Sequence, residues 1–407
     1  MISKTIRGFR AHLVWLGALL LSSCASPEST GPKQSTEAYF NRTAGRGDSL
    51  IIKVQLEDGH ELPFMLDTGA PVTVLDKSLE PELGKVLGTN VVRYGWLGDR
   101  TNHVFKAPKL YLGNLELHGA RRIWTDDVTN RAHSVPPLMG ILGMDYLGQY
   151  AVQLDFSQCK IRFLNPEQLK RNSMGKALQF SRKDGMIMPY ENLLEVKGAK
   201  TIVDTADYDD GALDAKTFQR QLQPQRPGAT THEWTDSLCR HVRELNLSGI
   251  TFRGQAYTNL VLRDCTFSSD PKMNVIGLRF LARHLVTFDF SKNRMYLKQN
   301  SVGALLDPEV KEGVDFLVSL KRNKRLPGFS NDDRGVMTKY FYETGFFAGT
   351  YPLSIRYDVK KQNDTSFYHY TIGRNAPNSS WILQRAWQTD SEGNTIEKFA
   401  SELSKER

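Results

Sequence analysis

Residues 64–75 read Phe-Met-Leu-Asp-Thr-Gly-Ala-Pro-Val-Thr-Val-Leu. An apolar run ends here in Asp67-Thr68-Gly69, and a second apolar run follows the proline. This pattern predicts a buried strand that delivers an aspartate into a tight turn. A related stretch returns as Thr-Ile-Val-Asp-Thr-Ala at residues 201–206. Two such turns in one chain predict two carboxylates that are held rigidly as a pair.

Other segments repeat with a similar offset. Gly140–Leu147 follows the first aspartate, and Asn274–Leu281 follows the second at a comparable distance. Each is followed by a predicted pair of strands, and each copy has a leucine-rich segment midway; these matched segments are 152–163 with 286–297, and 110–115 with 245–250. The offset is roughly 135 positions throughout. A constant offset indicates internal duplication of one mainly β unit.

This order of motifs resembles the retropepsin-like aspartic peptidases of bacteria, in the single-chain form in which a duplication replaces a homodimer. The resemblance covers roughly residues 45–298. It implies a mainly β fold with two tandem lobes, each a β barrel of the acid-protease type. It also implies that Asp67 and Asp204 are catalytic. By the same resemblance, active-site loop support falls on Thr68, Gly69, Thr205 and Ala206, with Gly143 and Gly277 in the segments packed beneath.

The second motif departs from the family pattern. Ala206 stands where the family has a glycine, at a position that we expect to need positive φ, where a methyl group costs about 1 kcal/mol. The nearby Asp207, Asp209 and Asp210 add negative charge, which we expect to raise the pKa values of the pair. Alternatively, the second lobe has lost catalysis and kept the fold, or the first lobe acts through self-association.

A glycine-interrupted β segment at residues 91–99 occupies the place of the family's flap, which closes over a peptide. The resemblance assigns flap and substrate-binding roles to Tyr94, Gly95, Trp96 and Gly98. Hinge freedom would come from the two glycines, and apolar surface from the two aromatic side chains. The other interpretation is a hairpin turn with packed aromatic residues.

The N-terminal residues have the pattern of an export signal. Basic residues precede a short apolar run at 13–21, which predicts a secretory signal peptide over residues 1–23. The run ends in Leu-Ser-Ser-Cys, which resembles the bacterial lipobox, so Cys24 is the predicted lipidation site; an ordinary signal peptide is the alternative. Residues 24–44 lack apolar periodicity and predict a flexible tether. We therefore expect an exported, membrane-anchored lipoprotein, in the periplasm or on the outer surface.

The remaining chain divides into three predicted units. The first lobe covers residues 45–165, the second covers 166–298, and a short helix capped by Asn165 joins them. Residues 299–407 change in composition. There a helix beginning near Asp307 precedes aromatic-rich strands, which predicts a small α+β accessory domain without a recognisable catalytic constellation.

Composition excludes several classes of function. The formal charge of +8 falls to about +5 without the signal peptide, which is mild basicity and far from a nucleic-acid-binding footprint. No zinc-protease, nucleophile-elbow or phosphate-loop motif occurs, and the acidic cluster lacks calcium-loop spacing, so we expect no metal and no cofactor. Cys159, Cys239 and Cys265 remain beside Cys24, and a Cys239–Cys265 disulfide is possible in an exported protein.

Two aspartates are sufficient for peptide hydrolysis. Neighbouring carboxyls share one proton, so one takes a proton from water while the other donates to the peptide carbonyl. The sequence therefore predicts an aspartic endopeptidase of the cell envelope that acts on peptides or proteins. We expect a monomer, with self-association as the alternative. The other candidate function is a catalytically inactive peptide-binding or envelope scaffold, which Ala206 favours.

Overall fold

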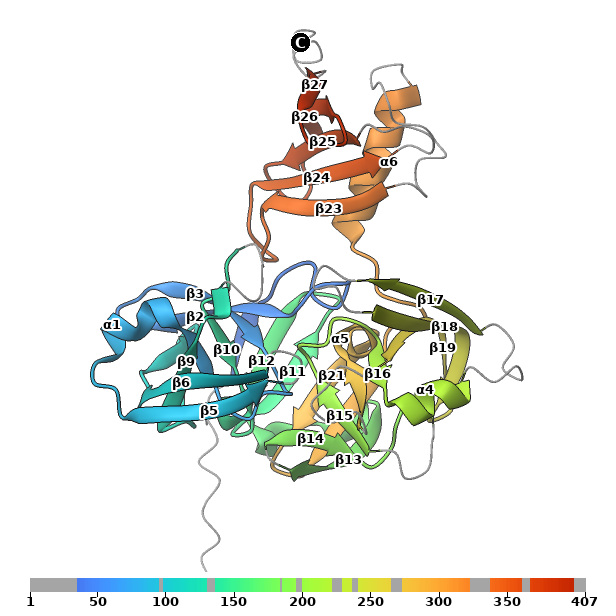
Figure 1. Cartoon of the computed structure of the whole chain (residues 1–407). Helices are drawn as coiled ribbons and strands as arrows, with labels where there is room; N and C mark the ends of the chain where they lie inside the picture. The colour runs from blue at the N-terminus through green and yellow to red at the C-terminus, as the bar shows by residue number, and fades with distance from the viewer. Residues whose placement is uncertain are drawn as a thin grey trace, which may run out of the picture. The chain divides into compact units, whose positions relative to one another are not determined.

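The computed structural model describes residues 35–94, 98–129, 136–183, 185–194, 200–221, 229–235, 241–264, 273–322, 337–360 and 367–398 (Figure 1). The predicted signal peptide and the cysteines Cys24, Cys239 and Cys265 lie outside these residues. Cys159 is buried as a free thiol. Among the described residues, no helix combines the length and the apolar character needed to cross a membrane.

The first lobe contains a nine-stranded sheet in the order β5-β6-β9-β4-β10-β3-β2-β7-β8. Its strands are β2 (Ile51–Leu56), β3 (Glu61–Leu66), β4 (Val74–Asp76), β5 (Gly88–Tyr94), β6 (Gly98–Lys106), β7 (Leu110–Leu112), β8 (Leu115–Leu117), β9 (Arg122–Asp126) and β10 (Gly140–Leu142). The 3₁₀ helix η1 (Lys77–Leu79) and helix α1 (Glu80–Leu83) follow β4, and α3 (Met144–Leu147) follows β10.

The second lobe repeats this order within a larger sheet. Its strands run β17-β18-β19-β16-β20-β15-β14-β13, which matches β5-β6-β9-β4-β10-β3-β2 position by position before β13. The bounds are β13 (Lys176–Lys183), β14 (Met186–Pro189), β15 (Lys200–Asp204), β16 (Gly211–Leu213), β17 (Ala229–Thr235), β18 (His241–Phe252), β19 (Gln255–Asp264) and β20 (Met273–Gly277). Helix α4 (Ala215–Gln221) follows β16, and α5 (Leu278–Leu281) follows β20. The repeated order shows that one β unit has been duplicated.

One predicted repeat match is wrong. Residues 110–115 form the β7–β8 hairpin, which turns at Gly113, whereas residues 245–250 lie inside the long strand β18. The corresponding turn of the second lobe comes later, between Phe252 and Gln255. Leucine spacing alone could not reveal this, because β18 and β19 continue past the point where the first lobe starts separate strands.

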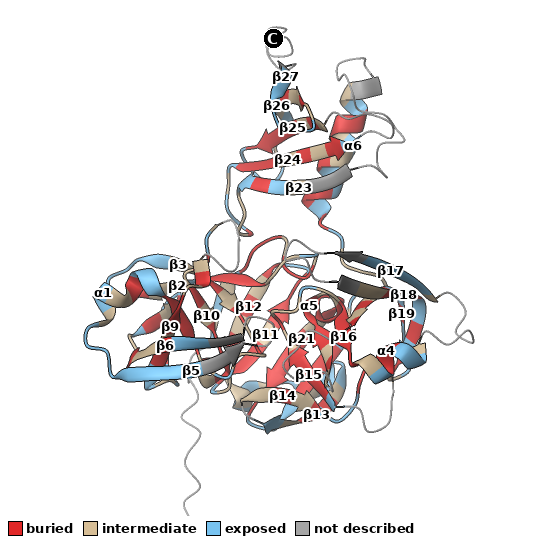
Figure 2. Cartoon of the chain, in the orientation of Figure 1, coloured by how far each residue is buried: buried red, intermediate tan, exposed pale blue. Residues whose placement is uncertain are grey.

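A shared sheet joins the lobes. The order β1-β12-β11-β21-β22-β13 crosses from the first lobe to the second through the antiparallel pair β11–β21. The additional strands are β1 (Thr36–Tyr39), β11 (Ala151–Asp155), β12 (Lys160–Leu164), β21 (His284–Asp289) and β22 (Arg294–Gln299). Buried side chains from both lobes form one continuous apolar cluster, and buried positions run along these strands (Figure 2). The connection contains η2 (Pro166–Gln168), a 3₁₀ helix capped by Asn165 as predicted, and η3 (Arg171–Ser173).

The flexible-tether prediction for residues 24–44 is wrong from Thr36 onward. Thr36–Tyr39 form β1, which pairs with β12, and Phe40 and Ala44 are fully buried. Ala38 and Phe40 pack against the core at alternate positions, a signal too brief to distinguish from a polar linker. The preceding residues 24–34 lie outside the described part of the chain.

The C-terminal residues form a helix packed on an antiparallel sheet, as predicted. Helix α6 (Pro308–Arg322) places Val310, Leu317 and Val318 against buried residues of the sheet. The sheet order is β23-β24-β25-β26-β27, with bounds β23 (Met337–Thr344), β24 (Leu353–Lys360), β25 (Phe367–Arg374), β26 (Ile382–Thr389) and β27 (Thr395–Lys398). The last strand, β27, pairs with β26 at the edge of this sheet.

Candidate active site

Each motif aspartate emerges from a strand at the centre of its lobe. Asp67 follows β3, which pairs in parallel with β10, and its backbone N–H donates to Leu142 O at 3.0 Å. Asp204 ends β15, which pairs in parallel with β20. Both aspartates are half-buried. The same local topology therefore presents one carboxyl from each lobe.

Two threonines bind the aspartate loops to each other. The Thr68 hydroxyl donates to Val203 O at 2.8 Å and accepts from the Thr205 N–H at 3.1 Å. The Thr205 hydroxyl donates to Leu66 O at 2.7 Å and accepts from the Thr68 N–H at 3.0 Å. Both threonines are buried. This reciprocal set of four hydrogen bonds fixes the distance between the loops.

The two carboxyl groups lie close enough that each is among the causes that shift the pKa of the other, and the Asp204 carboxyl lies against Gly69 of the first loop. Within its own loop, Asp67 Oδ1 accepts from the N–H groups of Gly69 at 2.6 Å and Ala70 at 3.0 Å. Asp204 Oδ1 accepts only from the Ala206 N–H, at 2.8 Å, among the hydrogen bonds of the described residues. The first carboxyl is thus better solvated by backbone donors than the second.

Burial and proximity raise the pKa of both groups. Desolvation raises the pKa of Asp67, while the Gly69 N–H, Asp204 and the Ala70 N–H oppose the shift. The pKa of Asp204 is raised well above its ordinary value, first by desolvation, then by the charge of Asp67, then by that of Asp207. The pair shares protons, and the geometry favours the proton on Asp204.

Gly69 and Ala206 differ in their surroundings. A Cβ on Gly69 would lie 2.8 Å from Asp204 Cγ, so the opposite carboxyl occupies the space of a side chain. Neither residue has positive φ, so the expectation that Ala206 is strained by its backbone conformation is wrong. Glycine is required in the first loop by close approach, and the second loop accommodates a methyl group.

The segments after β10 and β20 support the aspartate loops from below. The Met144 N–H donates to Ala70 O at 2.9 Å, and the Leu278 N–H donates to Asp207 O at 2.7 Å. Gly143 and Gly277 pass so close that an added Cβ would lie 2.8 Å and 2.4 Å from loop backbone atoms. Both glycines therefore allow a short helix to pack directly beneath each loop.

The acidic cluster of the second loop is neutralised by arginines that sequence reasoning missed. Arg263 of β19 pairs with Asp207 at 2.7 Å and with Asp209. Arg283 pairs with Asp210 at 2.8 Å, and both of these side chains are fully buried. We expected all three aspartates to raise the pKa of Asp204. Only Asp207 is among the causes of that raised pKa.

The flap prediction lies partly outside the described residues. β5 and β6 form an antiparallel pair that ends at Tyr94 opposite Gly98, whereas Gly95 and Trp96 lie outside, and the side chain of Tyr94 is not described. In the second lobe, β17 and β18 pair in the corresponding place, ending at Thr235 opposite His241. The structure thus has an antiparallel strand pair at the predicted flap position of the first lobe, and a similar pair in the second.

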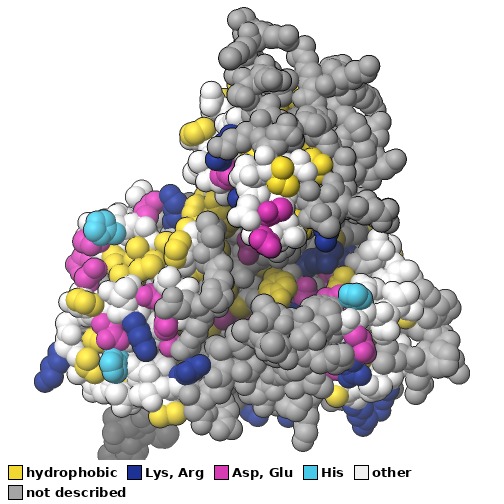
Figure 3. Space-filling view, turned by 45° about the horizontal axis from the view of Figure 1, so that its top comes forward, with side chains coloured by type: hydrophobic (Ala, Val, Ile, Leu, Met, Phe, Trp, Pro, Cys, Tyr) yellow, Lys and Arg dark blue, Asp and Glu magenta, His cyan; other side chains and the backbone are white. Residues whose placement is uncertain are grey.

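The surface outside the site carries both signs of charge. Acidic and basic side chains are interspersed over the coloured part of the face in Figure 3. The described residues contain no group of three or more His, Cys, Asp or Glu arranged to hold a metal ion.

Comparisons with known proteins found one family model and similar solved structures. Residues 52–146 match the family model described as aspartyl protease. The structure is similar to the crystal structure of aspartic proteinase from Irpex lacteus, with a TM-score of 0.41 and 12% sequence identity over 66% of this chain and 98% of that chain. No curated protein matches the sequence. The matched family segment and the duplicated strand order give this chain an aspartic-protease fold, as predicted.

Proposed function

We propose that this chain is an aspartic endopeptidase that hydrolyses peptide bonds with a water held between Asp67 and Asp204. The observation that carries the proposal is the reciprocal hydrogen bonding of Thr68 and Thr205, which holds the Asp204 carboxyl against the loop of Asp67. If each loop only ended a strand, the structure would not need the Asp204 carboxyl to lie beside the loop of Asp67.

The proposed roles follow from the asymmetry of the pair. Asp67, with two backbone donors, is the carboxylate that accepts a proton from the attacking water. Asp204, with its pKa raised further, is the acid that donates to the oxygen of the scissile carbonyl. After attack, the C–N bond of the tetrahedral hydrate breaks: the proton on Asp67 passes to the leaving amine, and a hydroxyl of the hydrate returns a proton to Asp204 as the new carbonyl forms. Charge stays within the pair during the reaction, which limits solvent reorganisation.

The deciding experiment is a peptide-library cleavage screen from acidic to neutral pH with wild type, Asp67→Asn and Asp204→Asn. We expect both substitutions to abolish cleavage while the melting temperature stays close to that of wild type. Loss in Asp67→Asn alone would point to self-association of first lobes. Absence of cleavage by wild type at every pH would favour the peptide-binding scaffold, the function that Ala206 supports.

The β5–β6 hairpin is the proposed flap over the substrate, with Tyr94, Gly95, Trp96 and Gly98 at its end. If Trp96 contacts the peptide, Trp96→Ala should raise KM about tenfold or more with a smaller change in kcat. An unchanged KM would leave the hairpin as a structural element only.

We also propose that the protein is exported and anchored to a membrane through acylated Cys24. The support is the lipobox-like Leu-Ser-Ser-Cys after a basic and apolar N-terminal run. Mass spectrometry of the N-terminal peptide should detect a lipid-modified cysteine in wild type. Cys24→Ser should release the protein from the membrane fraction, and recovery in the membrane fraction unchanged by that substitution would refute the anchor.

A further inference from the structure

One face of the first lobe's sheet forms an apolar wall beside Asp67. Strand register aligns five residues across neighbouring strands, and these are Ile51, Met65, Ile141, Val74 and Trp124. Alternate residues of a strand share a face, so Met65 lies on the same side of the sheet as Asp67, about 7 Å away along the chain. An extended peptide that reached Asp67 along this face would lay side chains against the wall.

The C-terminal part of the chain already covers this wall. Residues 345–352 connect β23 to β24, and Phe346 and Phe347 pack against the cluster that contains Ile51 and Val74. The two phenyl rings lie 5.3 Å apart, and the Lys53 ammonium lies 5.4 Å from the centre of the Phe347 ring. Two adjacent aromatic side chains therefore occupy an apolar surface on the face of the candidate active site.

Backbone pairing holds this loop like an added strand. Phe347 forms an antiparallel bridge with Asn41, the Arg42 N–H donates to Phe346 O at 3.0 Å, and the Ala348 N–H donates to Phe40 O at 3.1 Å. Segment 40–42 in turn pairs with β2 through Phe40 and Ile52. Addition of an extended segment to a sheet edge, with side chains in apolar sites, is a standard mode of peptide binding.

The matching face of the second lobe is shorter in apolar residues and ends in a charged side chain. The matching register there runs from Ile202 through Val275 and Ala212 to Arg263, which lies opposite Glu244. Arg263 occupies the place that Trp124 has in the first lobe. Trp124 pairs with Val74 of β4, and Arg263 pairs with Ala212 of β16, the strand that corresponds to β4. The phenylalanine pair thus matches the chemistry of one lobe only.

We propose that the Phe346–Phe347 loop is a built-in occupant of the substrate-binding wall, and that the chain is restrained from binding peptides while this loop is seated. The inference rests on the proposed peptidase function, because the wall is assigned to substrate through its place beside Asp67. The restraint is competitive: a substrate and the loop cannot occupy the same apolar surface together.

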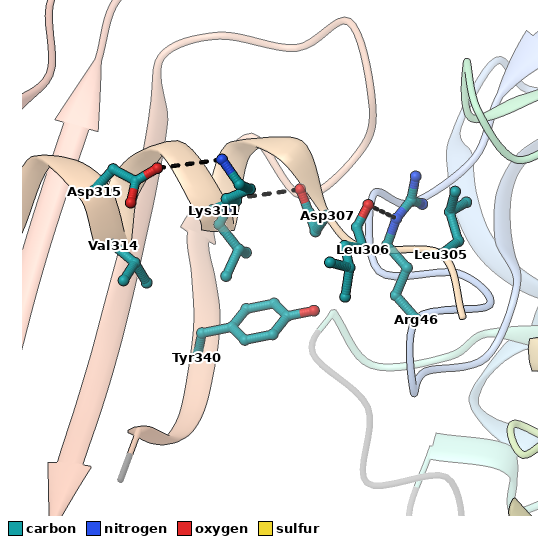
Figure 4. Close-up of a pocket in the computed structure, with 9 residues that line it drawn as sticks. Arg46, Leu305, Leu306, Asp307, Lys311, Val314, Asp315 and Tyr340 are labelled. Carbon is teal, nitrogen blue, oxygen red and sulfur yellow. Dashed lines mark hydrogen bonds and ion pairs between the residues drawn. The ribbon is translucent and has the colours of Figure 1, made fainter. Parts of the chain in front are cut away.

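A buried ion pair fastens the loop in its seat. Arg42 Nη1 lies 3.1 Å from Glu309 Oε1 of α6, and Arg42 Nε donates to Gly345 O at 3.0 Å. Nearby packing is incomplete, because a cavity of about 340 Å³ opens among Arg46, Leu306, Val310 and Tyr340 (Figure 4). Arg42 therefore holds the loop in addition to the apolar contacts of Phe346 and Phe347.

The test measures binding of a fluorescein-labelled peptide with the sequence of residues 343–351, by anisotropy, in an Asp67→Asn background that cannot cleave it. Phe346→Ala/Phe347→Ala should vacate the wall and bind this peptide at least about tenfold more tightly than the Asp67→Asn parent. Phe341→Ala is the matched control, since Phe341 is 40% exposed on β23 and is not among the described residues packed in the cluster of Ile51 and Val74. Equal affinity in all three proteins would overturn the proposal.

A second variant covers the case in which the double substitution fails to fold. Arg42→Met removes the fastening and keeps both phenylalanines, while Glu309 retains Arg374 as its partner. It should also bind the peptide more tightly than the parent, and unchanged affinity would count against the loop. With Asp67 intact, the same variants should show raised kcat/KM for peptide cleavage. If the variants bind the peptide more tightly but no form that contains Asp67 cleaves it, the peptidase function is refuted. The proposal that the Phe346–Phe347 loop occupies the wall is then retained.

Discussion

At the scale of single residues, the aspartate loops show why similar motifs tolerate different side chains. Gly69 lies against the carboxyl of Asp204, whereas Ala206 adopts an ordinary backbone conformation with its methyl group accommodated. A sequence motif marks both positions as glycine-like, but only the first is constrained by contact. The absence of glycine in the second motif is therefore weak evidence against catalysis.

Reciprocal substitutions should expose this difference. In Gly69→Ala the new Cβ would meet Asp204 Cγ at 2.8 Å and displace the carboxyl, so we expect cleavage to fall about 100-fold or more. Ala206→Gly should retain activity and lose about 0.5–1 kcal/mol of unfolding free energy, because glycine has more freedom in the unfolded chain. Steady-state kinetics with urea denaturation measures both effects, and equal activity losses would contradict the assignment.

Thr205 carries a separate prediction. Thr205→Val removes the hydroxyl that donates to Leu66 O and accepts from the Thr68 N–H, which leaves two buried backbone groups without these partners. We expect a loss of about 2–4 kcal/mol in unfolding free energy, together with reduced cleavage. Thr231→Val, on the exposed part of β17, is the control and should change neither quantity. A mutant as stable as wild type would show that the hydrogen bonds are replaceable.

The sequence could predict site residues that directly follow an apolar strand, but not site residues on strands that are distant in the sequence. Asp67, Thr68 and Asp204 follow recognisable apolar runs, so both loops could be predicted. Arg263 could not, because its place beside Asp207 depends on the parallel pairing of β16 with β19, which no local pattern encodes. The strand order, rather than the local sequence, therefore determines which cations neutralise the aspartates near Asp204.

At the scale of elements, the short helix α5 and the strand β21 bury a histidine. His284 is fully buried, its Nδ1 lies 3.1 Å from Phe280 O, and its Nε2 lies 2.9 Å from the Tyr257 hydroxyl. Desolvation lowers the pKa of His284 to about 4, with a further contribution from the neighbouring charge of Arg283. The imidazole is therefore neutral in the folded protein under mildly acidic conditions.

This buried imidazole sets an acid limit on stability. The unfolded chain takes up the proton near pH 6.5 and the folded chain only near pH 4, so stability is fully present above pH 6.5 and falls as the pH drops between these values. The loss reaches about 3 kcal/mol, from 6.5 − 4 = 2.5 pH units. His284→Gln should flatten this part of the stability–pH curve.

Urea denaturation at a series of pH values between 4 and 7 measures the slope. His60→Gln is the control, because the His60 side chain is 79% exposed, and it should keep the wild-type slope. An unchanged slope in His284→Gln would place the acid sensitivity elsewhere.

Element prediction succeeded where periodicity extended over several residues. The strand that ends before Asp67, the strand pairs after each glycine segment and helix α6 were predicted correctly. β1 was missed because its four residues become a strand only by pairing with β12, far along the chain. Short edge segments of this kind depend on a partner rather than on their own sequence.

At the scale of the whole molecule, a buried charge network joins the N-terminal segment to the C-terminal part. Glu309 lies between Arg42 and Arg374, and the three residues are each 9% exposed. Glu309→Ala should cost about 3–5 kcal/mol of unfolding free energy, because two guanidinium groups are left buried without this partner. Glu312→Ala, on the same helix, should cost below about 1 kcal/mol because the Glu312 side chain is 55% exposed.

Thermal and urea denaturation of the two glutamate variants provides the comparison. Similar stabilities would show that Glu309 does not hold the N-terminal segment against α6. A large difference, accompanied by faster proteolysis near residues 345–352 in Glu309→Ala, would link this network to retention of the loop.

The pairing of β11 with β21 has a consequence for dividing the chain. Five residue pairs connect these strands, from Ala151 with Asp289 to Asp155 with Leu285. If the backbone were cut in the connection near Lys170, each fragment would expose an unpaired edge strand, β11 in one fragment and β21 in the other. Co-expressed halves should then reassemble into a two-chain protein. An N-terminal half expressed alone should instead pair β11 with β11 of an identical copy and form a symmetric dimer.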